Sequence, residues 1–377
     1  MTMLRASRPT PRTGPATDFR PDRDPGPPSV MIDASDPVRR LSSAARGPTS
    51  LPIDYDKRLM LFSGRANPAL AAKIAGKLGV DPGRVTLKTF SNGEVYCRYD
   101  ESIRGADVFI IQPTCGNPET GVSANDALME LMFMIDAAVG ASAHRVIAVT
   151  PWFGYSRQDK KSAPREPISA RLVARMLESA GADRVVTMDL HAGQVQGFFQ
   201  KPVDHMTAIM MLTQYFADLN LQDLVIVAPD AGRVKLNKKF SRMLGAELAI
   251  LDKERPAQQV AEIGYVIGDV RGKTALIVDD MIDTAGTLRA AGQTVRDEGA
   301  ARVFAAATHA VLSGNAFENL AASPFEQIVV TDTIPLRRGA PENIRVLSCA
   351  ELLTRSIRSI FTDDSVSEVF GGENQLF

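Results

Sequence analysis

The residues with the clearest chemical potential are two adjacent carboxylates, Asp279 and Asp280, which directly follow an apolar run at 275–278. The run is short and β-branched at its end, so it predicts a strand buried on both faces of a parallel sheet. After the acids come the small residues of 283–287 and then a helical pattern over 288–298. A strand, a short loop and a helix start together predict an anion site, because free backbone N–H groups and the helix dipole face the ligand.

The acid pair needs a second explanation, because two carboxylates would repel a bare phosphate. A sugar phosphate satisfies both features, with its phosphate in the loop and its ring hydroxyls on Asp279 and Asp280. Thr284 and Thr287 add hydroxyl donors to the loop, and Gly286 lets its backbone approach closely. The alternative is that the two acids only cap a helix.

Three further stretches place polar side chains just after predicted strands. One contains Arg157, Lys160 and Lys161, which suit a polyphosphate, and the other two contain His191 and Asp230. Because ligands bind at the carboxyl ends of the strands in such sheets, a shared Mg²⁺–nucleotide site is one interpretation. A solvated charged face, a structural histidine and a helix-capping carboxylate are the alternatives.

Two other segments could also contact a nucleotide. Phe90 could stack on a base while Asn92 and Glu94 bond its edge, although Asn-Gly turn chemistry also fits an ordinary hairpin. Lys253 and Arg255 project from a predicted mobile loop, where two cations could neutralise charge that develops on a polyphosphate. The alternative for this pair is two exposed charges on a β-hairpin.

Strand and helix patterns alternate along the chain from residue 59, which predicts an α/β fold with parallel sheets. The predicted strands are 59–64, 108–113, 145–150, 184–189, 224–229, 247–251, 275–280, 302–309, 327–331 and 345–349, and the predicted helices are 68–78, 124–139, 169–180, 233–244 and 288–298. The segment that begins at Val108 resembles the one at Ala275, and the segment at Arg145 resembles the one at Arg302. This internal echo suggests two related domains, with the acid pair only in the second.

Composition sets the broad class of the protein. The chain has 377 residues, of which 45% are hydrophobic and 23% charged, as in a soluble protein of two domains. A net charge of −1 argues against nucleic-acid binding, no stretch suits a membrane span, and three scattered cysteines predict a reducing, cytoplasmic setting. Residues 1–54 hold ten of the 23 prolines and predict a disordered extension, with an organelle transit peptide as the alternative.

Taken in order, these motifs resemble one family, the ribose-phosphate pyrophosphokinases, over residues 59–370. The motifs that carry the resemblance are FSNGE, GYSRQDKK, DLHAGQVQGFF, PDAG, DKER and VDDMIDTAGT. The resemblance implies two similar phosphoribosyltransferase-like domains, each a central, mainly parallel sheet flanked by helices. It divides the chain into a first domain at 55–204, a second at 205–360, and a tail at 361–377 that returns to the first.

The resemblance also implies a role for each motif. The ATP-binding residues would be Phe90, Asn92, Glu94, Arg157, Gln158, Asp159 and His191, with the first three reaching a neighbouring subunit's site. The ribose 5-phosphate residues would be Asp230, Asp279, Asp280, Asp283, Thr284, Ala285, Gly286 and Thr287. His191 and Asp230 would hold Mg²⁺, and Lys253 and Arg255 would be the catalytic pair.

The implied reaction transfers the diphosphoryl group of ATP to the anomeric hydroxyl of ribose 5-phosphate, giving 5-phosphoribosyl 1-diphosphate and AMP. The implied assembly is a homo-oligomer, with a hexamer favoured. A regulatory anion site would involve Ser102, Arg104, Ser365 and Ser367. Arg233 stands where the family typically has a second glycine, and it could crowd the sugar site or add a phosphate contact. A catalytically silent paralogue and a phosphoribosyltransferase are the competing hypotheses.

Overall fold

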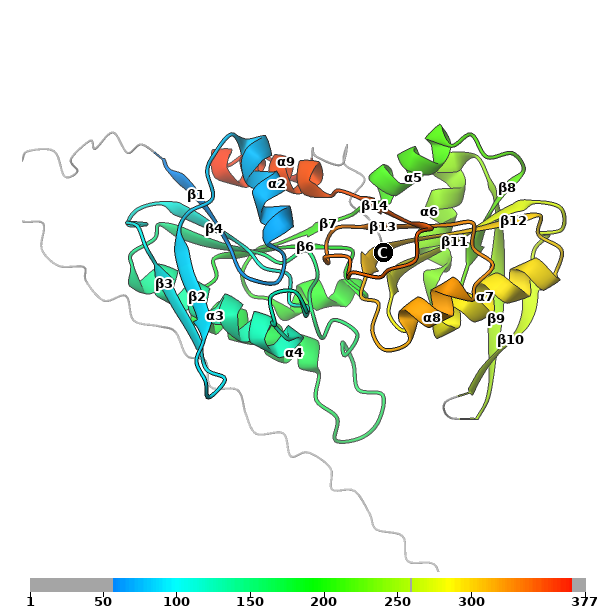
Figure 1. Cartoon of the computed structure of the whole chain (residues 1–377), viewed down its shortest axis with the longest axis horizontal. Coiled ribbons are helices and arrows are strands. Elements are labelled where there is room, and N and C mark those ends of the chain that lie inside the picture. Colours follow the sequence, from blue (N-terminus) through cyan, green and yellow to red (C-terminus); the bar gives the residue numbers. More distant parts are fainter. Residues whose placement is uncertain (1–56, 258–259, 368–377) are drawn as a thin grey trace, which may run out of the picture. The chain divides into compact units, whose positions relative to one another are not determined.

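The structure is a computed structural model that describes residues 57–257 and 260–367, without the side chains of residues 253–264. It contains two mainly parallel β-sheets flanked by helices, which confirms the predicted fold class (Figure 1). The predicted extension at 1–54 lies outside the described residues. Within the described part, no helix has the length and apolar character that crossing a membrane requires.

The first sheet has five parallel strands. In spatial order they are β1 (Leu59–Ser63), β4 (Asp107–Ile111), β5 (Arg145–Val149), β6 (Arg184–Met188) and β7 (Val203–Met206). A separate antiparallel hairpin is formed by β2 (Val85–Thr89) and β3 (Val95–Tyr99). All five residues of β4 are buried, as expected for a strand covered on both faces.

The second sheet has seven strands. In spatial order they are β10 (Val260–Ile267), β9 (Glu247–Ala257), β8 (Leu224–Ala228), β11 (Thr274–Ile282), β12 (Arg302–Ala310), β13 (Gln327–Thr331) and β14 (Ile344–Leu347). Only β10 runs antiparallel to its neighbour, and it forms an edge hairpin with β9. The strand that carries the acid pair, β11, lies near the centre between β8 and β12.

Helices connect the strands and cover the sheets. They are α2 (Pro68–Leu78), α3 (Ala124–Gly140), α4 (Ser169–Ala180), α5 (Ile209–Asp218), α6 (Val234–Leu244), α7 (Gly286–Asp297), α8 (Ala316–Ala321) and α9 (Ala350–Thr362), with short 3₁₀ turns at Gly193–Phe198 and Ala231–Arg233. Local signals set their limits: Asn67 caps α2 at its start, and Gly79 ends it with φ of 76°. Ser123 and Asp126 form a capping box at the start of α3.

One face of each sheet contributes to a single shared core. Phe109 of β4 and Leu276 of β11 both belong to it, together with Phe216 of α5 and Leu353 of α9. Because side chains alternate along a strand, the neighbouring residues of β4 and β11 point into two separate cores, which α3 and α4 cover in the first sheet and α7 and α8 in the second. Helix α9, although last in the chain, packs beside α2 (Figure 1).

The internal echo in the sequence corresponds to a repeated strand order. In the first sheet the order is β1-β4-β5-β6-β7, and in the second β8-β11-β12-β13-β14 follows the same path. The echo pairs Gln112 with Asp279, and Gln112 is fully buried, with its amide bonded to the Ala66 N–H and to Glu130. A Cβ on Gly64 would meet the Gln112 side chain at 2.3 Å, so packed protein fills the space beside Gln112.

The structure adds elements that the sequence analysis did not predict and changes one. Helices α5, α8 and α9 and strand β7 had no predicted counterpart, and the segment predicted as a loop after residue 251 is the end of β9. The predicted domain boundary at 204 falls within β7, which belongs to the first sheet. The described residues form one compact unit, and the limits of two domains stay a prediction.

We expect Phe216→Ala to lower the free energy of unfolding by about 3–5 kcal/mol, because it leaves a cavity in the core that both sheets share. Phe216 is 1% exposed, and its ring contacts that of Phe304 edge-on at 6.4 Å between centroids. Met210 lies on the same helix with 50% exposure, so Met210→Ala is the control and should change the value by less than about 0.5 kcal/mol. Guanidinium unfolding measures both, and equal effects would contradict the shared core.

Candidate functional site

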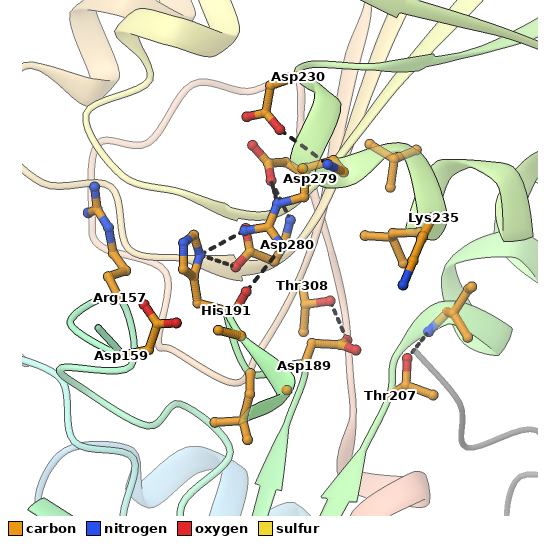
Figure 2. A pocket seen from close by; sticks show the side chains of 18 of the residues that line it. Arg157, Asp159, Asp189, His191, Thr207, Asp230, Lys235, Asp279, Asp280 and Thr308 are labelled. Carbon is orange, nitrogen blue, oxygen red and sulfur yellow. Dashed lines mark hydrogen bonds and ion pairs between the residues drawn. The ribbon is translucent and has the colours of Figure 1, made fainter. Parts of the chain in front are cut away.

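The carboxyl ends of strands from both sheets meet at one pocket of about 470 Å³. His191 follows β6 of the first sheet, whereas Asp230 follows β8 of the second sheet and the acid pair lies in the last half of β11. Figure 2 shows Asp279, Asp280 and His191 directed toward one another, with Arg157 and Asp159 on the neighbouring loop. The structure thus brings polar residues that follow separate strands to the lining of one pocket, and their role as a binding site stays a prediction.

Arg233 occupies the centre of this group and neutralises the acid pair. Its Nε lies 3.0 Å from Asp279 Oδ1, and its Nη2 lies 2.7 Å from Asp280 Oδ1. The Asp280 side chain is only 5% exposed and that of Arg233 15%, so water screens this contact far less than a surface ion pair. Arg233 thus pairs with the carboxylate oxygens to which sugar hydroxyls were predicted to bind.

The two carboxylates have opposite pKa shifts. Burial, together with the charge of Asp280, raises the pKa of Asp279 well above its usual value, although Arg233 opposes this. Burial acts on Asp280 too, but the hydrogen bond from His191 and the charge of Arg233 outweigh it and lower the pKa of Asp280 to about 2. Asp280 is therefore the firmly ionised member of the pair, and Asp279 is the member that takes up a proton more easily.

His191 lies between Arg233 and Asp280 and touches both through one nitrogen. Its Nδ1 lies 2.8 Å from Asp280 Oδ2 and 2.7 Å from Arg233 Nη2. A neutral imidazole nitrogen either donates or accepts, so only one of these contacts is a hydrogen bond at a time. Departure of Arg233 would leave Nδ1 free to donate to Asp280.

The predicted phosphate loop has the geometry expected of an anion site. Ala285 adopts a left-handed conformation with φ of 59°, and α7 begins at the next residue. The side chain of Asn319 donates to the carbonyl of Thr284 at 2.9 Å, and the Ser313 hydroxyl bonds to the Asp283 carboxylate. These contacts hold the loop from outside, so its N–H groups and the N-terminus of α7 can face a phosphate.

Arg157 connects the predicted nucleotide residues to this loop. Its Nη1 lies 2.5 Å from Asp283 Oδ2, which joins the loop after β5 to the loop after β11. Of its neighbours, Gln158 accepts a hydrogen bond from Ser169, and Asp159 accepts one from Gln194. The predicted ATP residues of this loop therefore border the predicted sugar-phosphate residues.

Other predicted site residues do not meet this pocket within one chain. Phe90, Asn92 and Glu94 lie at the turn of the β2–β3 hairpin and do not line it. Phe90 is 43% exposed, with its ring edge-on to Tyr96 at 5.8 Å and Lys88 over its face. An exposed aromatic ring at a hairpin tip can stack on a base, so the expectation that it serves a neighbouring subunit stays a prediction.

The predicted regulatory and catalytic residues also remain untested. Arg58 donates to the carbonyls of Ser102 and Arg104, two residues of the predicted anion site, while Lys57 contacts Phe361 and Asp363 at the end of α9. The tail residues of that site, Ser365 and Ser367, are hydrogen-bonded to each other at 2.7 Å. Lys253 and Arg255 lie on β9, and their side chains are outside the described residues.

Residues 59–181 of this chain match the N-terminal domain of ribose phosphate pyrophosphokinase, and residues 249–371 match the phosphoribosyl synthetase-associated domain. The chain is 48% identical over 318 residues to a ribose-phosphate pyrophosphokinase of Gloeobacter violaceus, covering 84% of this chain and 94% of the relative. The chain belongs to the ribose-phosphate pyrophosphokinase family. The crystal structure of phosphoribosylpyrophosphate synthetase from Mycobacterium smegmatis is 45% identical, with a TM-score of 0.76, and the match covers 81% of this chain and 100% of that one.

Mg²⁺, which the family implies, fits this pocket only as a partner of substrate phosphates. The ion prefers oxygen ligands and is usually held by one or two carboxylates together with phosphates. Asp230 offers such a carboxylate, whereas His191 offers nitrogen, which suits a phosphate contact better. Among the described residues no three His, Cys, Asp or Glu side chains form a metal cluster. The donor set thus fits an ion that binds together with a nucleotide.

A buried hydrogen-bonded group of Asp189, Thr308 and His309, of which Asp189 and Thr308 line the pocket, was not predicted from the sequence. The Thr308 hydroxyl donates to Asp189 Oδ2 at 2.6 Å, and His309 Nε2 bonds to the carbonyl of Met188 at 3.0 Å. Because a carbonyl only accepts, His309 carries its proton on Nε2, and burial lowers its pKa and keeps it neutral. Thr308 and His309 come near the end of β12, so the signal that found Asp230 could have found them.

These hydrogen bonds hold a strained turn next to His191. Asp189, two residues before His191, has a φ of 37°, a region that residues with a side chain seldom adopt. The backbone N–H of Ala208 also donates to its carboxylate, at 2.9 Å. The second sheet, through Thr308, thus holds the turn of the first sheet that carries His191.

We expect Thr308→Val to lower the free energy of unfolding by about 1–3 kcal/mol, because the buried Asp189 carboxylate loses a donor while the side-chain volume is kept. Thr308→Ser keeps the hydroxyl and is the matched control, with a smaller loss. Chemical denaturation of the three proteins makes the comparison. A Ser variant as unstable as the Val variant would show that the methyl group, rather than the hydroxyl, stabilises this turn.

Proposed function

We propose that this chain catalyses the Mg²⁺-dependent transfer of the diphosphoryl group of ATP to the anomeric hydroxyl of ribose 5-phosphate, giving 5-phosphoribosyl 1-diphosphate and AMP. One observation carries the proposal. The acid pair of the second sheet lines one pocket with Arg157 and His191 of the first, and Arg157 also pairs with Asp283 of the predicted phosphate loop. Membership of the ribose-phosphate pyrophosphokinase family supports the same reaction.

In this proposal the second sheet binds the sugar. The carboxylates of Asp279 and Asp280 accept hydrogen bonds from the ring hydroxyls, and the loop at 283–287 donates N–H groups to the 5-phosphate. Asp230, after the neighbouring strand, faces the same ligand from the start of α6. Anchoring the sugar at both ends fixes the direction of its anomeric hydroxyl, which supplies the orientation that a displacement at phosphorus needs.

The nucleotide then binds from the side of the first sheet. Arg157 and His191 are the cationic and hydrogen-bonding groups for its phosphates, and Asp159 and Gln158 border them. The base would stack on Phe90 of a neighbouring subunit, because that ring is exposed and lies outside the pocket of its own chain. The proposal therefore includes a homo-oligomer, with a hexamer favoured.

In the chemical step, the anomeric hydroxyl of ribose 5-phosphate attacks the β-phosphorus of ATP and gives up its proton. The bond between the α- and β-phosphates breaks, so the diphosphoryl group moves intact to the sugar and AMP leaves. Lys253 and Arg255, two residues apart on β9, are assigned to the charge that develops on the transferred group. Asp230 and the substrate phosphates would hold Mg²⁺, which would supply further charge neutralisation. No covalent protein intermediate is required, so positioning and electrostatics provide the rate.

One observation favours a second candidate function, a catalytically silent paralogue that assembles with active subunits. Arg233 is paired with both carboxylates that the sugar needs, and a cation fixed there would exclude the sugar. The phosphoribosyltransferase alternative lacks a comparable observation, since it leaves the Arg157 and His191 side of the pocket unused.

We expect AMP release from Mg-ATP only when ribose 5-phosphate is present, and its loss by about 10³-fold or more in Lys253→Ala, Arg255→Ala, because charge stabilisation is the main source of the rate. Chromatography of the nucleotides measures AMP. The charge-matched control is Lys238→Ala, Arg271→Ala, which removes two exposed cations outside the pocket and should keep the wild-type rate. A folded wild-type protein that makes no AMP under any condition would favour the silent paralogue.

A further inference from the structure

The most unusual feature of the pocket is a cation from its own wall seated on the sugar-binding acids. Arg233 Nε and Nη2 lie 3.0 Å from Asp279 and 2.7 Å from Asp280, and Nη1 lies 3.4 Å from the carbonyl of His191. A planar guanidinium can bridge two carboxylates with parallel N–H donors, which a single ammonium cannot do. Arg233 therefore uses the oxygens that two ring hydroxyls would need.

The backbone of Arg233 is fixed, so only its side chain can leave. Its N–H donates to Asp230 Oδ1 at 3.1 Å. The buried amide of Asn237 donates to the carbonyls of both Arg233 and Val278, each at 3.0 Å. These bonds hold the start of α6 against the end of β11, the strand that carries the acid pair. The position of the Arg233 Cα relative to the acids is thus set by the fold.

We propose that Arg233 sets the affinity of the sugar site, because its side chain competes with ribose 5-phosphate for Asp279 and Asp280. The inference rests on the proposed function, which assigns this acid pair to the sugar hydroxyls. When the Arg233 guanidinium is paired with both carboxylates, their oxygens are occupied and the site is closed to the sugar. With Arg233 displaced, the hydroxyls take over the same oxygens and the guanidinium is free to turn toward the phosphates.

When a side chain of the protein competes with a ligand, the apparent affinity for the ligand is its intrinsic affinity multiplied by the fraction of molecules in which the site is open. A side chain anchored this close has a high effective concentration at the acids, so the closed arrangement dominates in the absence of ligand. Removing the guanidinium should therefore tighten sugar binding, even though it takes a positive charge away from an anionic ligand. These two effects have opposite signs, which makes the direction of the change diagnostic.

The experiment is calorimetric titration of ribose 5-phosphate into the full chain at fixed Mg²⁺ without nucleotide. Arg233→Met keeps most of the side-chain length without the charge, and we expect it to bind the sugar phosphate about tenfold more tightly than wild type. Arg233→Lys keeps the charge but loses the bridging fork, and we expect an intermediate affinity. Lys238→Met removes a cation from an exposed position of the same helix, outside the pocket lining, and should leave the affinity unchanged.

A second measurement covers the stability of the variants. Ligand-free Arg233→Met should unfold at a lower temperature than wild type, because Asp280 loses its counter-charge, and saturating ribose 5-phosphate with Mg²⁺ should raise its unfolding temperature by more than it raises that of wild type. A smaller rise would overturn the inference.

The outcomes separate this inference from the proposed function. If Arg233→Met binds the sugar phosphate equally well or more weakly while wild type binds it and makes AMP, the competition is wrong and the proposed function stands. If Lys238→Met tightens binding as much as Arg233→Met, general charge rather than competition explains the effect. If wild type neither binds ribose 5-phosphate nor makes AMP, both the inference and the proposed function are wrong.

Discussion

The site depends on one electrostatic constraint, the buried carboxylate of Asp280. At 5% exposure this group can stay ionised only if fixed partners replace the water it has lost. One partner, Arg233, begins at the start of α6 in the same sheet, and the other, His191, comes from the turn after β6 in the first sheet. The charge of Asp280 is thus compensated by groups from both sheets, which the shared apolar core holds together.

The strand end of the first sheet that corresponds to the acid pair of the second satisfies its polar groups differently. At the equivalent strand end of the first sheet, Gln112 replaces the first acid and is fully buried among its own partners. Glu130, also fully buried, pairs with Arg65 there. Hydrogen bonds and an ion pair within the first half therefore satisfy Gln112 and Glu130. In the second half, Asp280 depends on the side chains of Arg233 and His191, and Asp279 pairs with Arg233 and accepts the backbone N–H of Asp280.

The sequence predicted the parts of the site that depend on the order of residues within one short segment of the chain. A buried strand followed by acids, small residues and a helix is readable without a structure, and the strands that precede His191 and Asp230 place both on the same edge. The contacts of Arg233 could not be predicted from the sequence, because they depend on the distance between α6 and β11. The buried side chain of Asn237 sets this distance by its hydrogen bond to Val278. The hydrogen bond from Thr308 to Asp189 could not be predicted, because the two residues are 119 positions apart in the sequence.

Arg157 and Asp283 show how the two halves influence each other through charge. Asp283 sits at the mouth of the phosphate loop, where a bare carboxylate would oppose an incoming phosphate. Arg157 neutralises it at 2.5 Å. A phosphate that draws Arg157 away would restore that negative charge. The ion pair therefore couples the charge of the loop after β5 in the first sheet to that of the predicted phosphate loop in the second.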